Sequence, residues 1–223
     1  IDNASAEDTL HIWAWTYYEA VEIDESITVI GNGTTNTTIN GTWSDYNIIK
    51  ISNEDVTVKN LKIVSGSNST IIPSIVVNSD DVTLDGIEIA GSYLGLKVSD
   101  VDNILVSNVT IKNTSGKAID IVSDSSNIVI KESVISFNNL GIKVNSDVLN
   151  LQIHNNSIHN NSDPGIRSET SGMIIRDNVI ADNSFYGIYL YGDENVEVFN
   201  VIENNTIKSN HDGIYLYEQE AKL

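Results

Sequence analysis

In this chain of 223 residues, basic and tyrosine side chains recur at one position of a repeated segment. Side chains of these types at this spacing could together bind a ligand. In eight aligned segments, the position after the first Ile or Leu holds Lys50, Val76, Lys97, Asp120, Lys143, Arg167, Tyr189 and Tyr215. Four of these eight residues are basic, although the whole chain has only 12 Lys and Arg. Two more tyrosines, Tyr191 and Tyr217, follow two positions further on. If the segments stack, a basic stripe runs into a patch of four tyrosines.

Such a stripe has the chemistry of a carbohydrate-binding face. Aromatic rings can stack on sugar faces, and Lys and Arg can pair with the uronate or sulfate groups of acidic polysaccharides. The expected partner is therefore a polysaccharide or surface glycan, and the candidate substrate-binding residues are Lys97, Lys143, Arg167, Tyr189, Tyr191, Tyr215 and Tyr217. Outward strand positions also favour Lys and Tyr for structural reasons alone, so a face without a ligand stays open as the alternative.

Carboxylates gather in the turns that follow the same segments. The densest group consists of Glu54, Asp55, Asp80, Asp81, Asp100 and Asp102. Carboxylates stacked in neighbouring turns repel one another, and a bound Ca²⁺ relieves that repulsion. These six residues are the candidate metal ligands, and Ca²⁺ is the candidate cofactor. The alternative is that each Asp bonds to the backbone of its own turn and stays solvated.

Asparagine is abundant, and two groups of asparagines carry different expectations. One group stands three residues after the last Ile of successive segments: Asn138, Asn161, Asn183 and Asn210. Stacked Asn side chains can hydrogen-bond along a repeat axis, so these four are expected to form a structural ladder. The other group, Asn32, Asn36 and Asn40, begins N-x-[ST] sequons in one Gly/Thr-rich loop and supplies the candidate glycosylation sites. Together with the acidity of the chain, the sequons favour an extracellular or cell-surface location.

The elements that must position these residues are short parallel strands. The eight segments begin at Ile49, Ile75, Leu96, Ile119, Ile142, Ile166, Ile188 and Ile214, at intervals of 21 to 26 residues. A strict two-residue alternation rich in Ile and Val predicts strands rather than helices. Two or three strands per period describe one rung of a parallel β-helix, whose rungs stack at about 4.8 Å. The alternation predicts that Ile142 faces a dry interior and that Lys143 faces outward.

Length and composition fit one all-β domain over residues 1–223, with about eight to nine rungs of 21 to 26 residues. Residues 1–47 would hold a cap remnant and the first rungs, and residues 48–223 the regular rungs. The net charge of −19 argues against a nucleic-acid-binding surface, and the absence of Cys excludes disulfides and thiolate metal sites. No apolar run approaches the length that a membrane span needs.

The segments GIKV, GIYLY and NNSIHNNSDPGI resemble the pectin-lyase-like, right-handed β-helix repeat of NosD-like and carbohydrate-active proteins. The resemblance implies a single-stranded, right-handed parallel β-helix in which Asp8–Gly33 forms the first full rung. It also implies that Ile1–Ala4 is the tail of a short cap helix. Because both ends then lack complete caps, the chain is expected to belong to a longer protein with flanking domains.

Enzymes of the resembled group supply the rival hypothesis. In that group, polygalacturonases use clustered Asp with nearby His and basic residues, whereas pectate lyases use Ca²⁺-binding carboxylates with an Arg base. This chain has only two Arg, Arg167 and Arg176, and its sequence places neither beside an acidic cluster. We therefore expect a non-catalytic β-helix module that binds carbohydrate or serves a structural or adhesive role. The alternatives are a Ca²⁺-dependent lyase, hydrolase or epimerase that acts on an acidic polysaccharide, and a stalk without a ligand.

Overall fold

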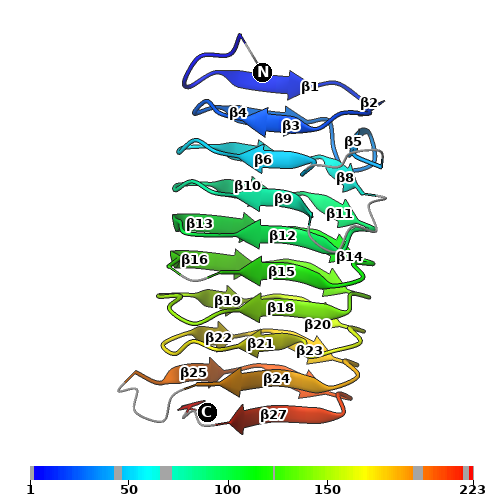
Figure 1. The fold of residues 1–223 in the computed structure, drawn as a ribbon. Coiled ribbons are helices and arrows are strands. Elements are labelled where there is room, and N and C mark those ends of the chain that lie inside the picture. The colour runs from blue at the N-terminus through cyan, green and yellow to red at the C-terminus, as the bar shows by residue number, and fades with distance from the viewer. Residues whose placement is uncertain are drawn as a thin grey trace.

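The chain coils into a right-handed parallel β-solenoid (Figure 1). The structure, a computed structural model, describes residues 3–42, 47–65, 72–122, 124–192, 198–217 and 221–222. Each turn contributes one strand to each of three sheets, and every strand pairs in parallel with its counterpart in the next turn. The described residues contain no helix, and thus none long and apolar enough to cross a membrane. The predicted fold class is confirmed.

The three sheets run the length of the coil, and we call them A, B and C in the order in which the chain enters them. Sheet A contains β1 (Thr9–Ile12), β4 (Thr28–Gly31), β7 (Thr57–Lys59), β10 (Thr83–Asp85), β13 (Asp102–Ser107), β16 (Ser126–Lys131), β19 (Gln152–His154), β22 (Ile174–Arg176), β25 (Asn200–Glu203) and β28 (Ala221–Lys222). Sheet B contains β2 (Trp15–Tyr17), β5 (Thr37–Asn40), β8 (Lys62–Val64), β11 (Glu88–Ala90), β14 (Thr110–Lys112), β17 (Val134–Ser136), β20 (Ser157–His159), β23 (Val179–Ala181) and β26 (Thr206–Lys208). Sheet C contains β3 (Val21–Ile23), β6 (Ile49–Ile51), β9 (Pro73–Val77), β12 (Leu94–Val98), β15 (Lys117–Ile121), β18 (Leu140–Val144), β21 (Ile166–Ser168), β24 (Tyr186–Tyr191) and β27 (Asp212–Tyr217).

The register of sheet C follows the predicted alignment residue by residue. Ile119 pairs with Ile142, which pairs in turn with Ile166, and the same column continues to Ile188 and Ile214. A one-residue slip would turn every apolar side chain of a strand outward, so the buried face fixes this register. Residues about 23 positions apart are therefore direct neighbours along the axis.

Left-handed residues divide each turn into its strands. β7 and β8 are separated by Asn60, whose φ is 56°, and equivalent corners are occupied by Asn108, Asn155 and Asn204 with φ between 53° and 56°. Asparagine tolerates this backbone region better than most residues because its short side chain can hydrogen-bond locally. A single alternating run such as Val56–Ile63 thus folds as two strands that meet at an angle.

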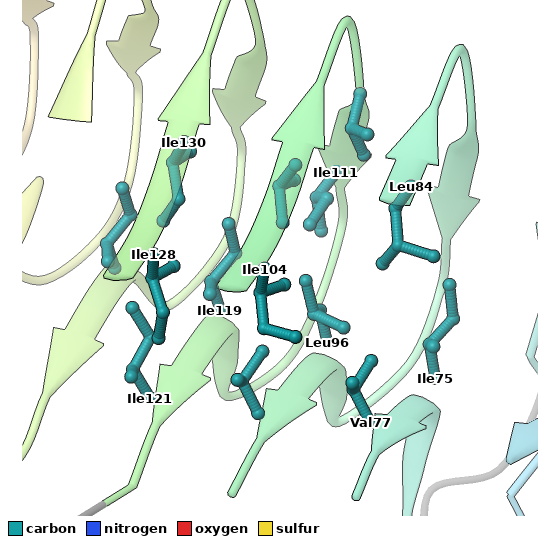
Figure 2. Close-up of a cluster of buried hydrophobic side chains, with 14 of the residues drawn as sticks. Ile75, Val77, Leu84, Leu96, Ile104, Ile111, Ile119, Ile121, Ile128 and Ile130 are labelled. Carbon is teal, nitrogen blue, oxygen red and sulfur yellow. The ribbon is translucent and has the colours of Figure 1, made fainter. Parts of the chain in front are cut away.

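Columns of Ile, Val and Leu fill the interior of the coil (Figure 2). Ile75, Leu96 and Ile119 come from successive turns of sheet C, and Ile104 and Ile128 face them from sheet A. Each of these side chains is at most 1% exposed. Full burial of such a side chain is worth about 1.5–3 kcal/mol, so the stacked columns supply the main stabilisation of the coil.

A column of small residues precedes the Ile column of sheet C for a steric reason. A Cβ on Gly141 would overlap the carbonyl oxygen of Gly165 in the next turn and would lie 3.2 Å from Cγ2 of Ile158 in sheet B. A Cβ on Gly187 would meet the carbonyl oxygen of Gly213 at 2.8 Å. The position lies inside the corner between sheets B and C, so lack of space requires Gly at Gly141 of the GIKV segment and at Gly187 of the first GIYLY segment.

The four asparagines of the expected ladder hydrogen-bond to one another along this corner. The Nδ2 atom of each donates to the Oδ1 atom of the next, from Asn138 to Asn161 at 3.1 Å, then to Asn183 and Asn210 at 2.9 Å each. Each Oδ1 atom of the last three also accepts the backbone N–H of the preceding ladder residue. Because buried polar groups are costly without partners, this chain of bonds makes a polar corner compatible with a dry core.

At the N-terminal end, the interior of the coil opens into a cavity of about 620 Å³. Inner side chains such as Leu10, Val21 and Ile23 line it, together with Trp13 and Tyr17. The expected cap helix is not seen in the described part of its range: Asn3 and Ala4 are not helical, and Ile1 lies outside the described residues.

Candidate functional site

The predicted binding residues lie on one continuous surface, the outward face of sheet C. Consecutive strand pairs place Lys97, Asp120, Lys143, Arg167, Tyr189 and Tyr215 in a single column, and Tyr191 pairs with Tyr217 beside it. We call the part of this face from Asp120 to Tyr217 the sheet C strip; it comprises Asp120, Lys143, Asn145, Arg167, Glu169, Tyr186, Tyr189, Tyr191, Tyr215 and Tyr217. The strip follows β15, β18, β21, β24 and β27 down the coil (Figure 1).

Five tyrosines form the C-terminal half of the sheet C strip. The ring centroids of Tyr189 and Tyr215 lie 5.5 Å apart, and Tyr186 lies 5.2 Å from the first and 4.9 Å from the second. Tyr191 and Tyr217 stack at 5.3 Å with an angle of 9° between their planes. Near-parallel rings at this distance overlap, so part of each face is covered by a neighbouring ring. The surface that a ligand meets is therefore made of ring edges, hydroxyls and the uncovered parts of the faces.

Tyr186 was not among the predicted binding residues. Strict alternation counted from Ile188 would turn Tyr186 inward, but Gly187 occupies the inner corner and Tyr186 joins the outward rings. Burial raises the pKa of its hydroxyl, and the nearby Tyr215, Asp212 and Tyr189 add to that increase. A Tyr hydroxyl is protonated at neutral pH in any case, and this shift holds that of Tyr186 further from ionisation.

The two cations of the strip share one carboxylate. Lys143 Nζ and Arg167 Nη2 each lie 3.6 Å from Oε1 of Glu169. The guanidinium carbon of Arg167 also lies 5.6 Å from the ring centroid of Tyr189, which makes a cation–π contact at the end of the tyrosine stack. The strip is thus a mixed surface in which the positive charges are already partly neutralised.

The basic column weakens toward the N-terminus. Lys50 pairs with Glu22 at 2.7 Å, and Lys117 pairs with Asp120 at the same distance. Lys97, between Val76 and Asp120 in the column, has no ion pair within the described ranges. The structure therefore brings Lys143 and Arg167 together with the tyrosines, whereas Lys97 stands one turn beyond Asp120.

Asn145 and Glu169 are further members of the strip that the sequence analysis missed. Each stands two residues beyond a predicted cation, Asn145 after Lys143 and Glu169 after Arg167, which is the offset that joins Tyr189 to Tyr191. Extending the same alternation by one more position would have found both.

Five of the six acidic residues proposed as metal ligands lie in turns between sheets C and A, and the sixth, Asp102, begins β13; the carboxylates of four of the six accept hydrogen bonds. Asp80 accepts the backbone N–H of Asp102 at 2.7 Å, and Asp81 accepts Nδ2 of Asn103 at 3.1 Å. Asp100 accepts Oγ of Ser99 at 2.8 Å.

Asp102 accepts bonds from Ser126 and Asn127, and these bonds, that from Ser126 foremost, lower the pKa of its carboxyl. Asp55 has the left-handed φ of 58° that suits a turn, and the backbone carbonyl of Glu54 accepts Oγ of Ser26. No three His, Asp or Glu side chains of the described ranges converge so that they could hold a metal ion. Ca²⁺ binding by these residues stays a prediction.

The candidate glycosylation sites lie around β5. Asn32 and Asn36 are exposed, and Nδ2 of Asn36 donates to the carbonyl oxygen of Asn32 at 2.9 Å. Asn40 is half-buried, and its Oδ1 accepts the backbone N–H of Thr42 at 2.9 Å. Glycosylation at all three stays a prediction.

The fold defines a class of protein, the right-handed parallel β-solenoids. The sequence matches the family described as "Right handed beta helix region" over residues 72–223, about two thirds of the chain, and the chain belongs to that family. The predicted resemblance is confirmed. A search of the curated proteins found no match.

Several solved structures share the fold at low sequence identity. The enzymatically active domain of tailspike protein 2 of bacteriophage CBA120 superposes with a TM-score of 0.66 at 13% identity, over 96% of this chain and 42% of that one. An alginate lyase from Paenibacillus gives 0.64 at 13% identity over 100% and 94% of the two chains. The pectin methylesterase of Aspergillus niger gives 0.64 at 15% identity over 98% and 84%. This chain thus spans less than half of the tailspike chain, and these likenesses concern the fold.

Proposed function

We propose that this protein is an extracellular or cell-surface β-helix module that binds a glycan along the sheet C strip. The observation that carries the proposal is the gathering of five tyrosines and two cations from successive turns on one outward sheet face. In a chain with only 12 Lys and Arg and nine Tyr, this strip concentrates the side chains that recognise sugars.

The geometry of the strip suits an extended ligand. Five turns at about 4.8 Å per turn give a strip of about 19 Å, long enough for several sugar rings laid along the axis. Tyr215, Tyr191 and Tyr217 are 40–42% exposed and offer ring surface and hydroxyls at its C-terminal end. Lys143, Arg167 and Glu169 supply charged donors and acceptors at the other end.

The comparisons support a carbohydrate ligand in general terms. Two of the solved structures with this fold are named for enzymes of polysaccharides, alginate lyase and pectin methylesterase. At 13–15% identity, these names indicate which class of ligand to test first. The residues that would contact the ligand are proposed from the strip alone.

A glycan array followed by isothermal titration calorimetry tests the proposal. Wild type should bind at least one array glycan, and the double variant Tyr189→Ala/Tyr215→Ala should bind it at least about tenfold more weakly, about 1.4 kcal/mol. The matched control is Phe137→Ala, which removes a 58% exposed ring whose neighbour is His159 of sheet B. Unchanged affinity of the double variant, or no binding to any glycan by folded wild type, would overturn the proposal.

The enzymatic alternative is tested in the same samples. A lyase would release unsaturated uronides that absorb in the ultraviolet, and a hydrolase would release new reducing ends. Either signal, measured with and without EDTA, would show catalysis and its need for Ca²⁺. A glycan that binds and is recovered intact would identify the module as a binder.

A further inference from the structure

Three side chains on successive turns of the sheet C strip each keep a buried polar atom without a hydrogen-bond partner in the described part of the chain. They are Oδ1 of Asp120, Oδ1 of Asn145 and Nε of Arg167. Asp120 as a whole is only 7% exposed, although it stands on the outward face between Lys97 and Lys143. Buried polar groups in folded proteins are nearly always paired, so three orphans on one small surface require an explanation.

The positions of the three residues make them one group. Asp120, Lys143 and Arg167 are direct neighbours in the column, and Asn145 stands beside them, two residues beyond Lys143. The next member of the column is Tyr189, whose ring lies under the Arg167 guanidinium. The orphaned atoms therefore adjoin the tyrosine stack on its N-terminal side.

The chemistry of the orphaned atoms restricts what can satisfy them. The two oxygen atoms, on Asp120 and Asn145, are acceptors that need a donor, whereas Nε–H of Arg167 is a donor that needs an acceptor. A carboxylate or sulfate accepts hydrogen bonds but donates none, so it can satisfy only the Arg167 nitrogen. A sugar hydroxyl both donates and accepts, so neighbouring hydroxyls of one sugar can satisfy all three, whether or not that sugar also carries an acidic group.

The charge of the whole chain favours an uncharged ligand. With a net charge of −19, the protein as a whole repels polyanions. Within this region Lys143 and Arg167 share Glu169 and Lys117 is paired with Asp120, whereas Lys97, next to Asp120 in the column, has no ion pair within the described ranges. The positive charge that remains is small against that of the chain, so the acidic polysaccharide that the basic column predicted is the competing ligand class in the test.

A ligand reaches these buried atoms when side chains of the strip move, and the ion pairs of the strip are loosely held. The contacts of Glu169 with Lys143 and Arg167 measure 3.6 Å, longer than a charged hydrogen bond. Partly exposed ion pairs of this kind contribute little to stability, and a long Lys side chain can swing aside at small cost.

We infer that Asp120, Asn145 and Arg167 form a subsite that selects an uncharged, hydroxyl-rich sugar and places it against the tyrosine stack. This inference rests on the proposed glycan binding and specifies its ligand class. The subsite holds hydroxyl groups, and the tyrosines hold the adjoining sugar ring.

The test uses a glycan array that carries uncharged, uronate-bearing and sulfate-bearing oligosaccharides, at about 0.05 M and about 0.5 M NaCl. Wild type should bind uncharged glycans with the same affinity at both salt concentrations, because no counterions are released. Binding restricted to uronate or sulfate glycans, and lost at high salt, would overturn the inferred ligand class while leaving glycan binding intact. Binding to no glycan at all would overturn the proposed function as well.

Variants of the subsite test the residues. Asn145→Leu keeps a similar volume and removes the orphaned oxygen, so it should weaken binding at least about fivefold while the melting temperature is unchanged or raised. Arg167→Lys should weaken binding similarly, because the charge stays and the Nε donor is lost. Asn139→Leu, on the exposed turn before β18, is the control and should leave affinity unchanged. Wild-type affinity in folded Asn145→Leu and Arg167→Lys would show that the subsite does not exist.

Discussion

The two sides of sheet C obey different rules although they alternate along the same strands. On the inner side, Ile119, Ile142 and Ile166 repeat the same side chain in each turn and are at most 1% exposed. On the outer side, the neighbouring positions change from Asp120 to Lys143 within one turn. The inner column helps to fix the register and accepts only apolar side chains such as Ile and Leu, whereas the outer column can differ in charge and polarity from turn to turn. In such a solenoid the outward side chains can therefore be adapted to a ligand without disturbing the core that stabilises the fold.

The largest contrast is expected between adjacent residues of β18. Ile142→Asp places a carboxylate in a dry column and should lower the free energy of unfolding by about 4 kcal/mol or more. Lys143→Gln removes one partner of a partly exposed ion pair and should cost less than about 1 kcal/mol. Melting temperatures from circular dichroism measure both effects, and similar values for the two variants would break the comparison.

A polar residue on the inner side should behave like a core residue. Asn161→Ala removes the Oδ1 atom that accepts two bonds from Asn138 and the Nδ2 atom that donates to Asn183, and it leaves buried groups unpaired. We expect a loss of about 3 kcal/mol in urea unfolding. Asn139→Ala, at an exposed position nearby, should stay within about 0.5 kcal/mol of wild type. A loss as small at Asn161 would mean that the ladder is dispensable.

The same substitution at two equivalent glycines separates crowding from backbone flexibility. Gly141→Ala adds a Cβ that overlaps the carbonyl oxygen of Gly165 and should cost about 2 kcal/mol. Among the described residues, the new Cβ of Gly213→Ala meets nothing closer than Cγ2 of Ile207 at 3.9 Å, so this variant should be neutral within about 0.5 kcal/mol. Equal losses in thermal unfolding would show that the loss of glycine's backbone freedom, and not the lack of space, sets the cost.

The smallest effect is expected on the outer side of sheet A, where Lys131, His154 and Arg176 are consecutive in one column. Burial, with Arg176 and Lys131 adding to it, lowers the pKa of His154 below its ordinary 6.5, and Glu132 and Asp177 oppose the shift. The unfolded chain then binds the proton more readily, so this stability is present above about pH 6.5 and is lost as the pH falls through the folded pKa.

His154→Gln should therefore flatten the decrease in stability between pH 7 and pH 5 by less than about 1 kcal/mol, since the ring is partly exposed. Lys131→Gln should flatten it by a smaller amount, because one cation is removed from beside the imidazole. Urea unfolding at several pH values provides the measurement. A steeper decrease in either variant would contradict the assigned sign.

The sequence alone predicted the fold and the column that carries the strip, for one physical reason. A two-residue alternation excludes a shift by one residue, and the Gly before Ile142, Ile166 and Ile188 aligns these segments. Lys143, Arg167 and Tyr189 could therefore be placed as neighbours without coordinates. The alternation did not predict Tyr186 as an outward residue, because the crowded corner at Gly187 reverses the alternation locally. The sequence also did not predict that Lys143 and Arg167 share Glu169, because ion pairing depends on side-chain rotamers, which periodicity does not encode.

Uniform register has a consequence for how such a molecule can change over generations. Removing residues 119–141 would seat Ile142 directly against Leu96, since each now pairs with Ile119. The excision would also delete Asp120 and set Lys143 beside Lys97. Duplication or loss of whole turns can therefore lengthen, shorten or reorder the exposed surface in a single genetic step. The core of the resulting protein still packs, because the inner columns of the remaining turns keep their register.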